Sequence, residues 1–136
     1  MFESCAQLWK LVNRFRSGTI GPADLRHREH LAIALCYAAI MPANAALESF
    51  REDLLRLTRS WGHESKYHET ITRFWLAVAA HHMRSQGEAR CLATAANGFI
   101  DRYGDKTLIE KHYSPALLFS AVARSNWVAP DRIAMP

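Results

Sequence analysis

The sequence predicts a compact all-α domain in which about five to seven helices form a single bundle. Apolar residues recur at spacings of three and four along most of the chain, and no stretch shows the alternation typical of a strand. Prolines and glycines fall between these periodic stretches, where they end one helix and start the next. With 136 residues, 49% of them hydrophobic and 22% charged, the chain has the size and composition of one globular domain, spanning 1–136.

The first half of the chain predicts three helices. Their expected ranges are 2–16, about 23–41 and 43–60. The pair Ser17-Gly18 ends the first helix, and Gly21-Pro22 forms a turn before the second. The second is the most apolar, and we expect it to end ahead of Pro42, because a proline disfavours helical conformation in the preceding residue. Gly62 ends the third helix.

The second half of the chain predicts four further helices and a tail. Their expected ranges are 67–84, about 88–103, 106–111 and 114–125. Gly87 and Gly104 separate the longer ones, and Ser114 followed by Pro115 is typical of a helix start, as N-cap and first helical residue. The tail at about 126–136 contains two prolines, so we expect it to be extended along the surface.

Charge and apolar patterning argue against two classes of partner. The formal charge is +4, but the basic residues are scattered and interleaved with acids, as in FREDLLRLTR, which does not favour nucleic-acid binding. The longest uncharged stretch, Leu31 to Leu47, is interrupted by Pro42 and Asn44, so we expect no membrane span.

Cysteine usage and the N-terminal residues favour a cytoplasmic location. The three cysteines are far apart and odd in number, which suggests neither a disulfide framework nor a zinc ribbon. The first residues, MFESCAQLWK, lack the basic and apolar regions of a signal peptide.

Three histidines interrupt the predicted apolar helix faces. His27 and His30 are three residues apart, and Leu31 and Ala34 continue the same face, so both imidazoles are expected to point inward. Such a pair can place two ring nitrogens on one metal ion. Burying two imidazoles side by side costs solvation, which favours a functional reason for the pair.

His68 is the third histidine of the predicted site. It begins a face that continues through Ile71, Thr72 and Trp75. If the second and fourth helices pack together, the three imidazoles converge, with Tyr67 and Glu69 beside them. The structural alternatives are a hydrogen-bonded core histidine and, for Glu69, a carboxylate that stabilises a helix N-terminus. An H-E-x-x-H zinc motif is excluded, because His68-Glu69 is not followed by a second histidine.

Over most of its length the sequence also resembles a family of small bacterial all-helical proteins of unknown function with HxxHL and YHETxT motifs. The resemblance rests on His27-x-x-His30-Leu31, on the YHETIT stretch that starts at Tyr67, and on Tyr113-Ser114-Pro115. Leu25 and Arg26 depart from the family pattern, which has an aromatic and a small polar residue there. The resemblance groups His27, His30, His68 and Glu69 into one site and implies no particular reaction.

Three functional interpretations follow. The first is a small helical metalloprotein with iron or zinc on His27, His30 and His68; with Glu69 and Tyr67 as catalytic groups it would be an enzyme. The second is a metal-free pocket for a small polar or anionic ligand. Its further candidate ligand-binding residues are Arg28, Thr72, Arg73 and Tyr113. The third is a non-catalytic partner-binding protein, which would expose an apolar patch and could be a homodimer.

Overall fold

The described residues form helices and no strands, as the sequence predicts. A computed structural model describes residues 1–86 and 91–136, and these contain no strand. The five longer helices are α1 (Cys5–Ser17), α2 (His27–Ile40), α3 (Ala43–Ser60), α4 (Glu69–Gln86) and α5 (Leu92–Tyr103). The shorter elements are η1 (Glu64–Lys66), η2 (Lys106–Lys111), α6 (Pro115–Leu118) and α7 (Ala121–Ser125). The predicted start of the fifth helix, near residue 88, lies outside the described residues.

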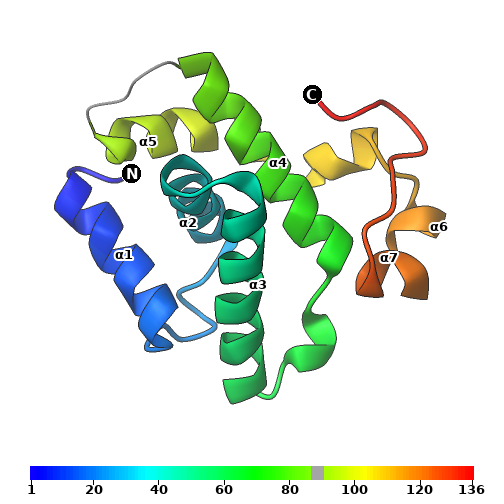
Figure 1. The fold of residues 1–136 in the computed structure, drawn as a ribbon, viewed down its shortest axis with the longest axis horizontal. Coiled ribbons are helices and arrows are strands. Elements are labelled where there is room, and N and C mark those ends of the chain that lie inside the picture. The colour runs from blue at the N-terminus through cyan, green and yellow to red at the C-terminus, as the bar shows by residue number, and fades with distance from the viewer. Residues whose placement is uncertain (87–90) are drawn as a thin grey trace.

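Helix α2 forms the centre of the core. Its residues 31–37, the run LAIALCY, are all buried, as expected for a helix that is apolar on every side. The helix packs against α1, α3, α4 and α5, and Figure 1 shows it lying between α1 and α4. Packing of α2 against α4 brings together the two helices that carry the predicted histidines.

Helices α1 and α3 are amphipathic and end at glycines. Helix α3 buries Ala46, Phe50, Leu54 and Leu57, at spacings of three and four. Gly18 follows α1 with φ of 75°, and Gly62 lies just beyond α3 with φ of 71°. Both backbone conformations are left-handed and favour glycine, which confirms the predicted helix ends.

The start of α2 differs from the expectation. The helix begins at His27 and not near residue 23, because residues 21–24 form a turn closed by a hydrogen bond from Asp24 N to Gly21 O. Arg26 is extended, and its backbone N–H donates to Glu29 Oε1 at 3.1 Å. His27 and His30 therefore lie in the first turn of the helix.

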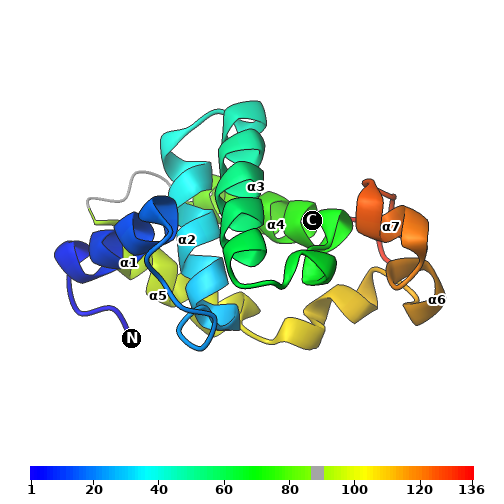
Figure 2. The same cartoon turned by 90° about the horizontal axis from the view of Figure 1, so that it is seen from below.

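The C-terminal region also differs from the expectation. The predicted helix at 114–125 is two short helices, because the Ser120 side chain accepts a hydrogen bond from Ala123 N and starts α7 as a new helix. The predicted helix at 106–111 is the 3₁₀ element η2. Asp131 of the tail accepts from the backbone and hydroxyl of Ser114, and Figures 1 and 2 both place α6 and α7 at the end of the molecule far from α1.

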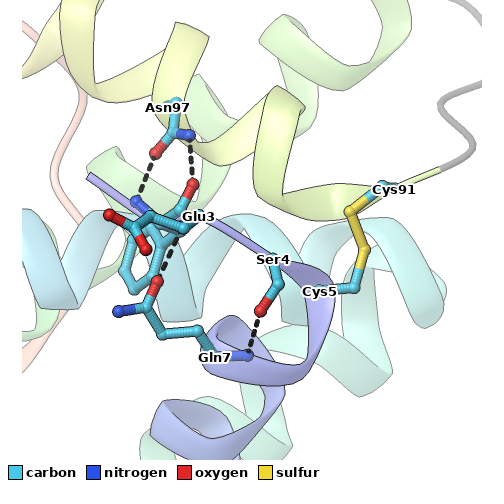
Figure 3. The surroundings of a disulfide bond; sticks show 7 residues. Glu3, Ser4, Cys5, Gln7, Cys91 and Asn97 are labelled. Atoms are coloured by element: carbon cyan, nitrogen blue, oxygen red, sulfur yellow. Dashed lines mark hydrogen bonds between the residues drawn. A yellow bond between two sulfur atoms is a disulfide. The ribbon is translucent and has the colours of Figure 1, made fainter.

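A disulfide joins Cys5 at the start of α1 to Cys91 just ahead of α5 (Figure 3). The sequence analysis did not predict this bond, because the two cysteines are 86 positions apart and only the fold brings their Cα atoms to 5.9 Å. The side chain of Asn97 adds a second tie between these segments: it accepts from Phe2 N and donates to Phe2 O. Cys36 is a free, buried thiol.

Among residues 1–86 and 91–136, no helix is long and apolar enough to cross a bilayer.

Candidate ligand-binding pocket

A pocket of about 400 Å³ lies between α2, α3 and the start of α4. Its predicted members are two histidines of α2, His27 and His30, and three residues around the start of α4, Tyr67, His68 and Thr72. Its remaining lining residues are Pro22, Ala34, Phe50, Leu54, Thr58, Trp61, His63, Lys66, Ile71 and Trp75. The pocket therefore joins both histidine-bearing segments at one place in the fold.

His30 is a neutral polar group in the pocket wall. The pKa of His30 is lowered to about 4, mainly by burial and also by nearby His27, while Glu29 opposes the shift. Neither ring nitrogen of His30 has a hydrogen-bond partner among the described residues. The side chain is only partly buried and lines the pocket. At neutral pH this imidazole offers one donor and one acceptor to whatever enters.

His27 has the same character at the first residue of α2. Burial lowers its pKa, Lys106 adds to the shift, and Asp105 opposes it. Its Nε2 atom is buried and has no hydrogen-bond partner in the described part of the chain. The ring lies edge-on to Trp75, with 4.9 Å between ring centroids. An unpaired buried ring nitrogen is costly, and the side chain that carries it lines the pocket.

His68 is bonded differently from the other two histidines. Its Nδ1 accepts the backbone N–H of Ile71 at 3.1 Å, so the side chain acts as the N-cap of α4. Because Nδ1 accepts, the proton lies on Nε2, which donates to Leu118 O at 2.7 Å. Both ring nitrogens are therefore occupied, and His68 joins the start of α4 to α6.

Glu69 anchors α4 to α3. Its carboxylate forms an ion pair with Arg51 and accepts the Tyr67 hydroxyl at 2.6 Å, while Arg73 lies 4.0 Å away. Burial alone would raise the pKa of Glu69, but the hydrogen bonds from Arg51 and Tyr67 outweigh it and lower the pKa. Burial and the same Glu69 contact raise the pKa of Tyr67 to about 12. Glu69 does not line the pocket, and its oxygens are engaged in the fold.

Thr70, which the sequence analysis did not single out, completes this anchor. It is fully buried, and its hydroxyl lies 2.6 Å from Ala123 O and 2.7 Å from Asn126 O. The backbone N–H of Val128 approaches the same oxygen at 3.3 Å. Residues 67–70 thus connect α4 to α3, α6, α7 and the tail.

The other candidate ligand-binding residues have separate surroundings. Arg28 is exposed and pairs with Glu29 at 3.3 Å, and Arg73 lies over Trp127. Tyr113 is fully buried, with its hydroxyl donating to Val128 O at 2.6 Å. Thr72 lines the pocket, but its hydroxyl donates to His68 O at 2.8 Å. The structure brings Thr72 to the pocket and leaves Arg28, Arg73 and Tyr113 outside its wall.

Sequence reasoning missed four pocket residues near the end of α3 and in the connection to α4: Thr58, Trp61, His63 and Lys66. The connection carries the sequence WGHESKYH, in which aromatic and basic residues alternate with turn residues. Loops positioned by rigid helices often carry binding groups, and this composition was the available signal.

The pocket also bears on the predicted metal centre. Within residues 1–86 and 91–136, no three or more His, Cys, Asp or Glu side chains are placed to hold a metal ion. His27 and His30 retain free ring nitrogens, whereas a metal at His68 would have to displace either the cap of α4 or the bond to Leu118.

Comparison with known proteins adds no family to this description. The chain matches no protein-family model, no curated protein and no solved structure. The resemblance carried by the HxxHL and YHETxT motifs stays a prediction from sequence, and the function has to be argued from the pocket itself.

Proposed function

We propose that this protein binds a small molecule in the pocket between α2, α3 and α4, without a metal ion. The carrying observation is that His27 and His30 present neutral imidazoles, without protein partners among the described residues, in a pocket otherwise lined mainly by apolar and aromatic side chains. A few convergent polar groups in an apolar cavity are typical of small-molecule sites.

The bonding of Glu69 and Tyr67 argues against the predicted catalytic role of these two residues. A general base needs a free lone pair near the substrate, but Glu69 is occupied by Arg51 and Tyr67. The raised pKa of Tyr67, about 12, also leaves this hydroxyl protonated at neutral pH. We therefore propose that these two residues shape the pocket.

Thermal unfolding with a set of small acids, amines and neutral aromatics tests the proposal. A ligand at ten times its Kd stabilises the folded state by about 1.4 kcal/mol, which raises Tm by roughly 4–6 °C for a domain of this size. The variant Ala34→Leu fills the pocket from α2 and should abolish the shift, whereas Ala39→Leu, on an exposed position of the same helix, should retain it. Equal shifts in both variants would place the binding elsewhere.

The metal site of iron or zinc is a second candidate, favoured by the free nitrogens of His27 and His30 in one pocket. Elemental analysis of the tag-free protein after anaerobic reconstitution distinguishes the two proposals. Near-stoichiometric metal in the wild type that is lost in His30→Ala and in His68→Ala, with the fold intact, would establish the metal centre and refute the metal-free proposal.

A partner-binding role is the third candidate. Phe119 and Val122, on and beside the short helices α6 and α7, are 71% and 61% exposed. Exposed apolar neighbours are typical of contact surfaces. Light scattering of the purified protein tests the homodimer, and the double variant Phe119→Ser/Val122→Ser should restore a monomer if this surface forms it.

The compartment is also open to a direct test. The Cys5–Cys91 bond is typical of oxidising compartments, whereas the sequence predicts the cytoplasm. Thiol labelling of protein taken from its own cells, with the free Cys36 as the internal reference, decides between the two.

A further inference from the structure

The charges around the pocket favour an anion over a cation. The described lining residues include one lysine, Lys66, and four histidines, but no aspartate or glutamate. Glu64, the acidic residue closest to Lys66 in sequence, is held by Arg59 with 2.9 Å between Nε and Oε1. Lys66 itself has no ion pair among the described residues, so its ammonium is available to a ligand.

The exposure of the lining residues distinguishes an open side of the pocket from an inner side. Lys66 and Pro22 are exposed, and His63 is half-buried, so these residues mark the open side. Ala34, Phe50 and Leu54 are buried and mark the inner side. The desolvation cost of a bound charged group is smallest where the group keeps part of its hydration, which places the charge at the Lys66 side.

The aromatic residues of the wall favour a planar body between these two sides. Phe50, Trp61, Tyr67 and Trp75 all line the pocket. Trp75 is fixed by edge-on packing against both His27 and Phe74, at centroid distances of 4.9 and 5.0 Å. Aromatic side chains prefer stacked or edge-on contact with other rings, and a volume near 400 Å³ suits a ligand of one or two rings.

Deepening the proposed function, on which this inference rests, we propose that the ligand is a small aromatic carboxylate. The ring lies among Phe50, Trp61 and Trp75, and the carboxylate lies at the open side near Lys66. A neutral hydroxyl or carbonyl of the ligand hydrogen-bonds the free imidazole of His30, which also lines the pocket. This arrangement gives the His30 imidazole a hydrogen-bond partner without burying a charge.

Three matched probes test the charge preference by calorimetric titration at low salt: 3-(4-hydroxyphenyl)propanoate, its primary amide and 4-hydroxyphenethylamine. We expect the acid to bind about five times more tightly than the amide, and the amine to bind more weakly than either. Lys66→Gln should weaken binding of the acid about two- to fivefold, as expected for one exposed charge, and leave binding of the amide unchanged. Lys66→Arg should restore the affinity for the acid. Lys10→Gln, on the exposed face of α1, is the matched control and should leave that affinity unchanged.

The His30 contact has its own test with 3-phenylpropanoate, which lacks the hydroxyl. The wild type should bind this probe about five to ten times more weakly than the hydroxylated acid, and His30→Ala should remove the difference between them. An amide or amine that binds as tightly as the acid overturns the inference and leaves the proposed pocket intact. Binding of none of the probes at millimolar concentration also overturns it, whereas the thermal shifts with the wider ligand set and with Ala34→Leu decide the proposed function separately.

Discussion

Two polar stretches meet at the same pocket and differ in how their side chains are bonded. Along residues 67–70, each side chain has a partner within the protein: Tyr67 donates to Glu69, His68 contacts Leu118, and Thr70 contacts Ala123. In the first turn of α2, His27 and His30 have no side-chain hydrogen bond among the described residues. The first stretch holds the helices together, and the second leaves its polar groups for a ligand.

This difference predicts that one stretch mainly affects stability and the other mainly affects binding. A buried polar group whose partner is removed destabilises the fold, whereas an unpaired group has no partner to lose. Variants along residues 67–70 should therefore lower the free energy of unfolding, and variants of His27 and His30 should change binding with little effect on unfolding.

The largest expected effect on stability comes from the Cys5–Cys91 disulfide. This bond lies outside both stretches, so its removal serves as a control. Cys5→Ser opens a loop between residues 86 positions apart and should lower the free energy of unfolding by about 2–5 kcal/mol. Urea unfolding measures this loss, and dithiothreitol should reproduce it in the wild type. Below its Tm the variant should still bind ligand, because the cysteines do not line the pocket. Loss of binding in the folded variant would show that the pocket depends on global stability and would invalidate the separation.

Glu69→Ala should produce the next largest effect. The Glu69 side chain is 10% exposed and neutralises Arg51, whose side chain is 32% exposed, so the loss should be about 2–3 kcal/mol, less than for a fully buried pair. A double-mutant cycle with Arg51→Ala measures the coupling by urea unfolding. Glu48→Ala, on the exposed face of α3, should change stability by less than about 0.5 kcal/mol. Coupling near zero would mean that this ion pair does not anchor α4.

The matched pair His68→Ala and His30→Ala tests the comparison directly. His68→Ala removes the N-cap of α4 and the bond to Leu118, which should cost about 1–2 kcal/mol. His68→Asn can still cap the helix and should recover about half of that loss. His30→Ala should change stability by less than about 0.5 kcal/mol and weaken ligand binding. Equal destabilisation by the two alanine variants would contradict the assigned difference.

The contrast also shows what the sequence could predict. The apolar run LAIALCY predicts a central buried helix, and the spacing of His27 and His30 predicts a shared face; both depend on neighbours along the chain. The partner of His68 is 50 positions away and that of Glu69 is 18 positions away. Long-range packing determines which polar groups have hydrogen-bond partners and which cysteines pair. Local periodicity does not encode this packing.

His82 provides the smallest effect and refines the comparison, because it is unpaired but does not line the pocket between α2, α3 and α4. The ring is 3% exposed and packs against Phe99 and Tyr103, and neither of its nitrogens makes a hydrogen bond with the described residues. Burial lowers the pKa of His82, Arg102 and His81 add to the shift, and the nearby Ala95 backbone opposes part of it. His82 is therefore neutral in the folded protein and serves the core between α4 and α5.

The lowered pKa gives His82 a defined effect on stability. Its neutral form is compatible with folding above the unfolded pKa of about 6.5, so the full stability is present there. As the pH falls below 6.5 the unfolded state takes up a proton that the folded state resists, and stability is lost by at most about 1.4 kcal/mol per pH unit for this residue. Urea unfolding of His82→Leu between pH 7.5 and 5.0 should show a shallower loss than the wild type, with the remaining slope due to His27 and His30. Identical slopes would mean that the pKa of His82 is the same in the folded and unfolded states, and that an unpaired buried imidazole in this protein need not have a lowered pKa.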